Sequence, residues 1–175
     1  MSAPKLILYI ASSLDGFIAG PHDDLSFLEA VAREGEDYGY AAFMKSVDTV
    51  IMGRNTYDWV IKHAEYPHAQ LQSYIITHRT EEARPGIIFY HGNLKNLIQE
   101  LKAKQAKNIF CDGGSSLLNQ LLQLGCIDEI ILSIIPVLLG KGTRLFHELE
   151  APLNLHLLKS ESFASGLVQV HYRIL

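Results

Sequence analysis

Cysteine is scarce in this chain, which has two among its 175 residues, Cys111 and Cys126. Two thiols are too few for a disulfide scaffold or a cysteine-based zinc site, so we expect both to be small, buried core residues. A domain of this length buries roughly 70% of the surface of its unfolded chain, so it can fold without a metal or a disulfide. The sequence therefore predicts a single domain over residues 1–175.

Positive charge is also sparse. The 15 Lys and Arg residues are outweighed by 19 Asp and Glu residues, which gives a net charge of −4, and they form no basic runs. Binding to nucleic acid is therefore not expected. Long apolar runs are missing too, since residues 5–11 are far shorter than a signal peptide or a membrane span. We expect a cytoplasmic protein with no membrane association, and the 48% apolar composition is typical of a globular domain.

Several catalytic signatures are absent from the sequence. There is no G-x-G-x-x-G fingerprint, no G-x-S-x-G nucleophile elbow and no H-E-x-x-H zinc motif. Residues 138–143 (Leu-Leu-Gly-Lys-Gly-Thr) do not match a P-loop, because the lysine precedes the second glycine, so we reject an ATPase. His63-Ala64-Glu65 matches half of a zinc deaminase signature, but the P-C-x-x-C half is missing and we treat the match as chance.

Apolar runs of strand length alternate with segments of helical spacing along the first three quarters of the chain. We expect strands at 5–11, 49–52, 73–77, 86–90, 108–111 and 128–136, and helices at 24–31, 38–46, 56–62, 93–104 and 115–124. Asn93 and Gly125 are expected to cap the last two helices. Residues 155–163 and 167–175 are expected to form an antiparallel hairpin. The pattern predicts an α/β fold with a mixed sheet, parallel early and antiparallel late.

The stretch 50–57 (Val-Ile-Met-Gly-Arg-Asn-Thr-Tyr) runs from an apolar strand through a glycine into a helix. A bare glycine backbone lets a ligand approach closely, and free N–H groups at a helix start favour anions. Arg54 adds a fixed positive charge beside Gly53. These features indicate a site for a phosphorylated nucleotide. The alternative is that Asn55 or Thr56 caps the helix and no ligand is involved.

A second junction of the same kind occurs at residues 109–117 (Ile-Phe-Cys-Asp-Gly-Gly-Ser-Ser-Leu). The adjacent glycines Gly113 and Gly114 permit an unusual backbone path and close contact with a pyrophosphate. Ser115 and Ser116 supply hydroxyls and an N-cap for the following helix. Two such junctions in one small domain favour a single extended ligand with several phosphates. A tight turn without a ligand is the alternative.

Thr77, His78 and Arg79 end the strand expected at 73–77. If this strand lies beside the strand at 49–52, Arg79 and Arg54 face the same ligand. Two arginines suit the 2′-phosphate that distinguishes NADPH from NADH. The alternative is an ordinary polar loop.

Asp15 is the candidate catalytic residue. It lies in Ser13-Leu14-Asp15-Gly16, in a loop after the first expected strand. A carboxylate in this place can bind a substrate N–H or help to deliver a proton. Asp-Gly is also a strong turn dipeptide, so a purely structural role is an equal alternative.

Four segments in this order resemble the dihydrofolate reductase-like superfamily, and more closely the reductase domain of bacterial bifunctional riboflavin-biosynthesis proteins, the RibD C-terminal domain family. The segments are residues 13–19, 50–56, 112–117 and 136–146. The resemblance covers nearly the whole chain. It implies a three-layer fold with a central, mostly parallel sheet of about eight strands, a C-terminal antiparallel hairpin and helices on both faces. It also implies a homodimer.

The same resemblance implies that NADPH lies across the strand ends. Residues 53–56 then contact its phosphates, and residues 77–79 lie by the adenosine 2′-phosphate. Residues 113–117, ending at Leu117, hold the pyrophosphate and flank the nicotinamide, with a cis peptide between Gly113 and Gly114. Ala11 and Ile18 border the nicotinamide. The implied activity is an NADPH-dependent reductase acting on a small heterocyclic or sugar-derived substrate.

Two departures from these families bear on the substrate. The Pro-Trp segment and the helix-borne acid of dihydrofolate reductase have no clear match, and Asp23, Asp24 and Glu29 are the acids nearest that place. The deaminase-like half of the bifunctional proteins is absent. We therefore expect a stand-alone reductase of the 5-amino-6-(5-phosphoribosylamino)uracil type. Dihydrofolate reduction, or NADPH binding without catalysis, are the alternatives.

Overall fold

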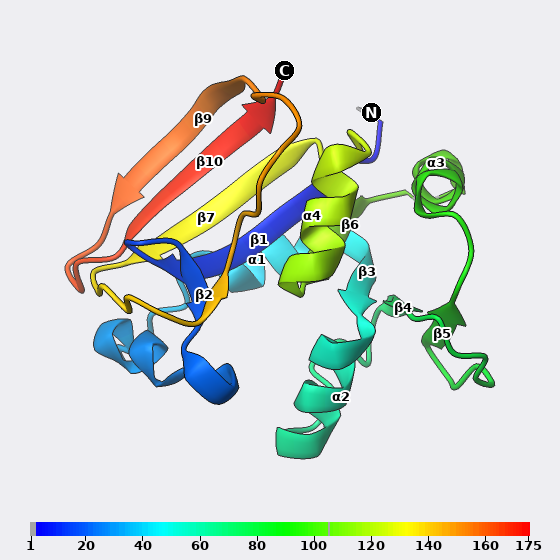
Figure 1. Cartoon of the computed structure of the whole chain (residues 1–175), viewed down its shortest axis with the longest axis horizontal. Coiled ribbons are helices and arrows are strands. Elements are labelled where there is room, and N and C mark those ends of the chain that lie inside the picture. The colour runs from blue at the N-terminus through cyan, green and yellow to red at the C-terminus, as the bar shows by residue number, and fades with distance from the viewer. Residues whose placement is uncertain (1–2, 105) are drawn as a thin grey trace.

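The computed structural model describes residues 3–104 and 106–175, and its centre is an eight-stranded sheet (Figure 1). The strand order is β5-β4-β3-β6-β1-β7-β10-β9. In chain order the strands are β1 (Leu6–Ser13), β3 (Val47–Gly53), β4 (Gln72–Ile76), β5 (Ile87–Tyr90), β6 (Asn108–Gly113), β7 (Glu129–Ile135), β9 (Leu155–Ser162) and β10 (Val168–Ile174).

The sheet is parallel from β5 to β7 and antiparallel at its last two strands. The predicted α/β class, the mixed sheet and the C-terminal hairpin are confirmed. The first strand, β1, occupies the centre, with Leu6 opposite Ile109 on one side and Ile7 opposite Glu129 on the other. The parallel strands therefore bring their carboxyl ends, from distant parts of the chain, to one edge.

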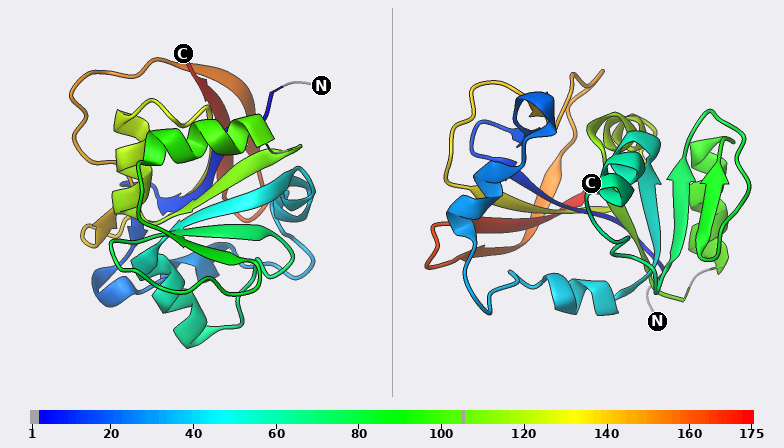
Figure 2. Two further views of the ribbon diagram at one scale, coloured as in Figure 1. Left: turned by 90° about the vertical axis from the view of Figure 1, so that its right-hand side faces the viewer. Right: turned by 90° about the horizontal axis from the view of Figure 1, so that it is seen from below.

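Helices cover both faces of the sheet (Figure 2). They are α1 (Tyr40–Lys45), α2 (Arg54–His63), α3 (Leu94–Lys104) and α4 (Ser115–Gln123), with the 3₁₀ segments η1 (Pro21–Asp23) and η2 (Ser26–Val31). The core under α3 and α4 joins Leu8 and Ile51 of the sheet to Leu97 and Leu118 of the helices. On the opposite face Phe110 packs with Phe43 of α1. Alternating residues along each strand feed the two cores.

Most predicted boundaries lie within a few residues of the observed ones, and the caps at α3 and α4 are confirmed. Asn93 Oδ1 accepts the backbone N–H of Asn96 at 3.0 Å. Gly125 has φ +63°, the left-handed conformation that ends a helix. Both cysteines are free and buried, as predicted. Burial raises the pKa of the Cys111 thiol to about 12, so it behaves as a small apolar residue.

The prediction of helices and strands was wrong in two places. The helix expected at 24–31 is only a short 3₁₀ segment, because the Asp24 carboxylate accepts the Ser26 N–H at 2.9 Å and closes a local turn. A small second sheet of β2 (Phe17–Ala19) and β8 (Thr143–Arg144) was not predicted. Its strands have three and two residues, too few to show a periodic pattern.

Within the described ranges, no helix is long and apolar enough to cross a membrane. Nor do the described residues include a group of three or more His, Cys, Asp or Glu side chains that could hold a metal ion.

Candidate active site at the carboxyl edge of the sheet

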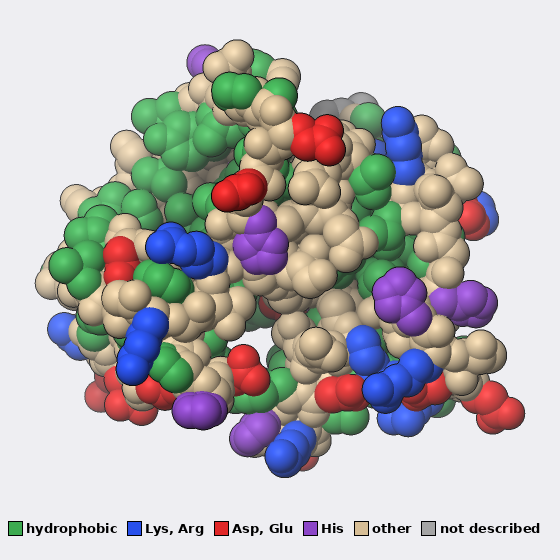
Figure 3. Space-filling view, viewed as in Figure 1, with side chains coloured by type: hydrophobic (Ala, Val, Ile, Leu, Met, Phe, Trp, Pro, Cys, Tyr) green, Lys and Arg blue, Asp and Glu red, His purple; other side chains and the backbone are tan. Residues whose placement is uncertain are grey.

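A cavity of about 990 Å³ opens at the carboxyl edge of the parallel strands. It runs past the ends of β4, β3, β6 and β1, where ligands of such sheets usually bind. In Figure 3 the surface is hollowed between the η1–η2 segment and α2, and Lys and Arg side chains gather on the α2 side. This volume is at the upper end of the range that is usual for ligand pockets, about 300–1,000 Å³.

The structure brings nearly all of the predicted cofactor residues to this cavity. Those that line it are Ala11, Ile18, Gly53, Arg54, Asn55, Thr56, Thr77, His78, Arg79, Gly114, Ser115, Ser116 and Leu117. Gly113 lies just behind the wall, with φ +95°. Asp15 is not among the lining residues.

The two strand–glycine–helix junctions lie against each other. A Cβ added at Gly53 would lie 3.5 Å from the Gly114 nitrogen, and one at Gly114 would lie 2.8 Å from Thr56 Oγ1. The Gly113–Gly114 peptide is cis, as the family resemblance implies. Glycine at position 114 therefore allows the second junction to lie close to Thr56 of the first. At Gly53 an alanine side chain would fit at an ordinary contact distance.

Neither helix start is capped by a side chain. The N-cap residues are Gly53 for α2 and Gly114 for α4, and neither helix has a side-chain cap hydrogen bond. The N-cap predicted for the serines was wrong, and the alternative of a cap from Asn55 or Thr56 is not observed, because all four residues lie inside the helices, at their first to third positions. Ser115 Oγ instead donates to the Arg144 carbonyl at 2.6 Å and lies 2.8 Å from His147 Nε2. The first N–H groups of both helices are thus left for an anion.

Arg54 extends from the start of α2, with its guanidinium in an acidic and aromatic setting. Its Nε donates to Asp58 at 2.7 Å, and Nη1 forms an ion pair with Glu81. The guanidinium carbon lies 5.5 Å from the centre of the Phe89 ring. Because β3 and β4 are neighbours, Arg54 and Arg79 line the same cavity, as predicted. Any bound phosphate competes with the two carboxylates for Arg54.

The wall formed by Ala11 and Ile18 is held in place by a loop-to-loop contact centred on Asp15. The Asp15 carboxylate accepts the Ser13 hydroxyl at 2.6 Å and the backbone N–H groups of Leu139 and Gly140 at 3.0 and 2.7 Å. These bonds, led by that from Ser13, lower the pKa of Asp15 to about 2. Both carboxylate oxygens of Asp15 accept hydrogen bonds outside the cavity, so the side chain links the loop after β1 to residues 139 and 140. Its catalytic role stays an untested prediction.

Aromatic side chains that the sequence analysis did not single out form another wall of the cavity. They are Tyr9, Tyr40 and Phe110. The centre of the Tyr40 ring lies 5.6 Å from the centre of the Tyr9 ring and 6.5 Å from that of the Phe110 ring. Both pairs are arranged edge to face. These three residues follow no periodic pattern in the sequence. Tyr40 lies at the wall because its helix, α1, packs against β1 and β6 through Phe43.

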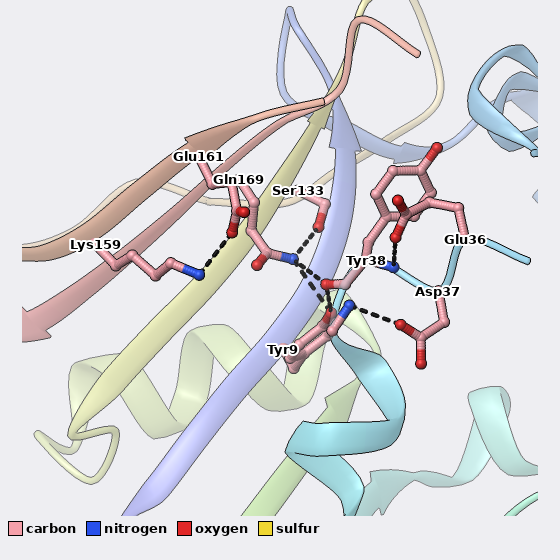
Figure 4. Close-up of polar contacts among 9 residues, drawn as sticks. Tyr9, Glu36, Asp37, Tyr38, Ser133, Lys159, Glu161 and Gln169 are labelled. Atoms are coloured by element: carbon pink, nitrogen blue, oxygen red, sulfur yellow. Dashed lines mark hydrogen bonds and ion pairs between the residues drawn. The ribbon is translucent and has the colours of Figure 1, made fainter. Parts of the chain in front are cut away.

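The Tyr9 hydroxyl is part of a polar network that fixes this wall (Figure 4). It donates to the Tyr38 carbonyl at 2.9 Å, and the Gln169 amide donates to the Tyr9 oxygen at 3.2 Å and to Ser133 Oγ at 3.0 Å. Burial raises the pKa of Tyr9. Tyr9 is therefore a fixed part of the wall with its proton engaged, and not a source of protons.

One more carboxylate lines the cavity, that of Asp112 on β6, directly before the glycine pair. Its Oδ2 lies 2.8 Å from Nε2 of His68. The Asp112 side chain is 27% exposed, whereas that of His68 is 2% exposed. Burial, and then the charge of Asp112, raises the pKa of Tyr40 to about 12. The position of Asp112 beside the glycines was a usable signal in the sequence, but nothing in the sequence points to His68.

The model of the RibD C-terminal domain family matches residues 4–169. The chain belongs to this family. A relative, the uncharacterized protein YwjB of Bacillus subtilis strain 168, is 36% identical over 170 residues, which is 96% of this chain and 97% of YwjB. The predicted family membership is thus confirmed, and the match spans nearly all of the chain.

Solved structures support the same assignment. A protein from Shewanella sp. PV-4 assigned to riboflavin biosynthesis superimposes with a TM-score of 0.89 at 32% identity, covering 98% of this chain and 99% of that one. The Thermotoga maritima deaminase/5-amino-6-(5-phosphoribosylamino)uracil reductase gives 0.73 at 16% identity, and this chain covers 57% of it. Dihydrofolate reductase from Enterococcus faecalis, in complex with NADP(H), gives 0.67 at 13% identity and covers 97% of this chain and 96% of that one.

The last two similarities, at low identity, establish the fold alone. They confirm the dihydrofolate reductase-like architecture that the sequence segments implied. Membership of the RibD C-terminal domain family indicates an oxidoreductase of the riboflavin-pathway type.

Proposed function

We propose that the protein is an NADPH-dependent reductase that transfers hydride to a small heterocyclic or sugar-derived substrate. The leading substrate is 5-amino-6-(5-phosphoribosylamino)uracil. The observation that carries the proposal is the meeting of two helix starts without side-chain caps, at Gly53 and Gly114, in a cavity that Arg54 and Arg79 also line. This combination suits an extended ligand with several phosphates better than any neutral metabolite.

The cavity residues fit the parts of NADPH in order along the sheet edge. Residues 53–56 and 114–116 present backbone N–H groups and hydroxyls to the pyrophosphate, and Arg54 adds charge. Thr77, His78 and Arg79, at the end of β4, lie where the 2′-phosphate of the adenosine half would be held. Ala11 and Ile18, on the opposite side of Gly114, offer an apolar surface for the nicotinamide.

Bound NADPH would supply the hydride, and the protein would supply orientation and exclusion of water. Ala11 and Ile18 limit the access of water on one side of the reacting ring. The aromatic wall of Tyr9, Tyr40 and Phe110 limits it on another. A flat substrate held between these surfaces would lose translational and rotational freedom before reaction.

A calorimetric titration with NADPH and NADH, side by side on the full chain, tests the cofactor. We expect NADPH to bind at least tenfold more tightly, because Arg79 would pair with the extra phosphate. Equal affinity for both cofactors would contradict a 2′-phosphate site, and binding of neither would overturn the reductase itself.

A turnover assay at 340 nm then tests the substrate. We expect NADPH oxidation with 5-amino-6-(5-phosphoribosylamino)uracil and compare it with dihydrofolate. Turnover of dihydrofolate alone would favour the folate alternative. Stoichiometric NADPH binding without oxidation by either compound would favour a binding protein without catalysis.

A further inference from the structure

The cavity has two sides that differ in charge. Arg54, Arg79 and the helix starts without side-chain caps lie on the side where the proposed cofactor is held. The opposite side, which we call the tyrosine side, comes from β1, the η1–η2 segment and α1. Its residues are Tyr9, Asp23, Leu25, Leu28 and Tyr40. A flat substrate beside the nicotinamide would lie against these side chains, so they limit which compounds can bind.

The tyrosine side lacks cationic side chains. Among the described residues, no lysine or arginine lines it. The histidines of the cavity also lie elsewhere: His78 and His91 follow β4 and β5, and His147 Nε2 lies 2.8 Å from Ser115 Oγ at the start of α4. The charged member of the tyrosine side is an acid, Asp23. A phosphate placed here would meet no side chain of opposite charge with which to pair.

The helix starts next to the tyrosine side are closed by carboxylates. At η2 the Asp24 carboxylate accepts the backbone N–H of Ser26 at 2.9 Å and the Ser26 hydroxyl at 3.0 Å. At α1 the Asp37 carboxylate accepts the N–H groups of Gly39 and Ala41, both at 2.9 Å. The starts of α2 and α4, in contrast, have no side-chain cap. The kind of N–H group that can bind an anion on the cofactor side is therefore already bound to an acid here.

The negative charge of these acids extends to the tyrosine rings. Hydrogen bonds, led by that from Ala41, hold the pKa of Asp37 below its usual value, so this carboxylate stays ionised at neutral pH. Burial, and in addition the charge of Asp37, raises the pKa of Tyr9. Burial and then the charge of Asp112 raise the pKa of Tyr40 to about 12. Charges of the same sign thus act on both rings, and they also repel an anionic ligand that packs against them.

We propose that the tyrosine side selects a planar heterocycle without phosphate or carboxylate groups, and that Asp23, Asp24 and Asp37 determine this specificity by repelling anions. The inference rests on the proposed reductase and narrows its small heterocyclic or sugar-derived substrates to uncharged members. For the pyrimidine named above, the ring is recognised and the phosphate is not, so the dephosphorylated form binds more tightly. The tyrosine rings, with Leu25 and Leu28, provide the contact area for such a ligand.

The first test measures binding without turnover, on the full chain saturated with NADP⁺, by ligand-observed NMR titration. The probes are 5-amino-6-(5-phosphoribosylamino)uracil and the same compound after enzymatic removal of its phosphate. We expect the dephosphorylated probe to bind at least tenfold more tightly at low salt. Equal affinity, tighter binding of the phosphorylated probe, or no binding of either probe would overturn the inference, and the bound NADP⁺ would leave the reductase standing.

Salt distinguishes charge repulsion from a steric effect. The distance over which exposed charges act falls from about 30 Å at about 0.01 M salt to about 3 Å at about 1 M. We expect the affinity ratio of the two probes to fall at least threefold when sodium chloride is raised from about 0.02 M to about 0.5 M. A ratio that does not change with salt would mean that shape excludes the phosphate, and it would overturn the role of the acids.

A triple variant identifies the residues. Asp23→Asn, Asp24→Asn and Asp37→Asn together remove three charges and keep the shapes of the side chains. Asparagine also bonds to helix starts, and it tolerates the left-handed conformation of Asp23, which has φ +60°. We expect the affinity ratio of the probes to fall at least threefold, through tighter binding of the phosphorylated probe.

The matched control combines Glu65→Gln, Glu100→Gln and Glu161→Gln. It removes the same number of charges from residues that do not line the cavity, and it should leave the ratio within twofold of wild type. Equal ratios in the aspartate variant and in wild type would overturn the role of the three acids. If the wild-type protein binds no NADP⁺, the proposed function itself fails. The comparison of the probes on the wild-type protein needs no variant, so it decides the case even if a substitution prevents folding.

Discussion

Arg54 illustrates how much of the proposed cofactor site depends on single side chains. It is anchored from both sides by Asp58 and Glu81, and its guanidinium faces the Phe89 ring. The anchoring acids hold the charge at the cavity before any ligand arrives, which limits the side-chain entropy lost on binding. They also compete with a phosphate, so the net gain is smaller than for an unpaired arginine.

We predict that Arg54→Ala raises the dissociation constant of NADPH about tenfold or more, since a hydrogen bond to a charged group is worth about 1.5–3 kcal/mol. Calorimetry measures the change. Arg84→Ala is a matched control, because the Arg84 guanidinium also lies 5.5 Å from the Phe89 ring but Arg84 does not line the cavity. NADPH affinity that is the same in the Arg54 variant and in wild type would remove Arg54 from the site.

Asp15 provides a second test at this scale. Its pKa is about 2 in the folded protein, below the ordinary value of 3.8, so its ionised form stabilises the fold. We predict that Asp15→Asn lowers the midpoint of thermal unfolding at pH 7. The difference in midpoint between the variant and wild type should persist down to about pH 3.8. It should shrink as the pH falls from about 3.8 to about 2 and vanish below that. Scanning calorimetry across this window measures it.

A catalytic Asp15 would behave differently. It would abolish turnover in the asparagine variant while leaving the unfolding midpoint at its wild-type value. Normal stability combined with lost activity would therefore contradict the structural role that the contacts to Leu139 and Gly140 indicate.

At the scale of elements, the small β2–β8 sheet contributes Ile18, Ala19 and Thr143 to the wall of the cavity. Gly142 has φ +137°, and an added Cβ would collide with the carbonyl oxygen of Ala19 on β2. We predict that Gly142→Ala lowers the free energy of unfolding by roughly 2–6 kcal/mol, since overpacking and backbone strain each cost about 1–3 kcal/mol. Urea denaturation measures the loss.

Gly140→Ala is the control in the same loop. Gly140 also has a positive φ, +72°, but its added Cβ would meet nothing within 4 Å. We expect a loss of about 1–2 kcal/mol, the cost of the left-handed conformation alone. Equal losses in the two variants would show that the contact with Ala19 contributes nothing.

Local sequence patterns predicted the helices and strands better than the contacts between them. Apolar runs predicted the strands of the large sheet, and the glycines that follow β3 and β6 predicted the place of the cavity. β2 and β8 were missed because they are too short for a pattern. Contacts across long sequence distances were missed as well: Tyr9 with Gln169 spans 160 residues, and His68 with Asp112 spans 44. Such pairs depend on the strand order, which no local pattern contains.

At the scale of the whole molecule, the β9–β10 end of the sheet carries exposed apolar side chains. Apolar side chains gather over the β9–β10 end of the sheet in Figure 3. Leu155 and Leu157 of β9 are 44% and 47% exposed, and Val168 of β10 is 40% exposed. An apolar patch of this kind is typical of an interface between proteins. We therefore propose that two copies associate through the β9–β10 hairpin.

The predicted result is a homodimer at micromolar concentration, measured by sedimentation velocity. Leu157→Lys should shift the population toward monomer, because it places a charge in the apolar patch. Ile61→Lys, a change at a 44% exposed residue of α2, which packs on β3 and β4 at the other side of the sheet, is the control and should leave the dimer intact. A wild-type protein that sediments only as monomer would refute the dimer.

The central position of β1 has a consequence for how the chain acquires its structure during synthesis. The strand leaves the ribosome before the other strands of the sheet, yet its neighbours β6 and β7 begin only at Asn108 and Glu129. Until those segments emerge, the apolar residues of β1 have no strand to pair with, and closing loops of about 100 residues is slow. The part of the cavity wall that β1 provides is thus synthesised well before the strands that complete the wall. Nascent and truncated chains should accordingly rely on chaperones to keep this strand from aggregating.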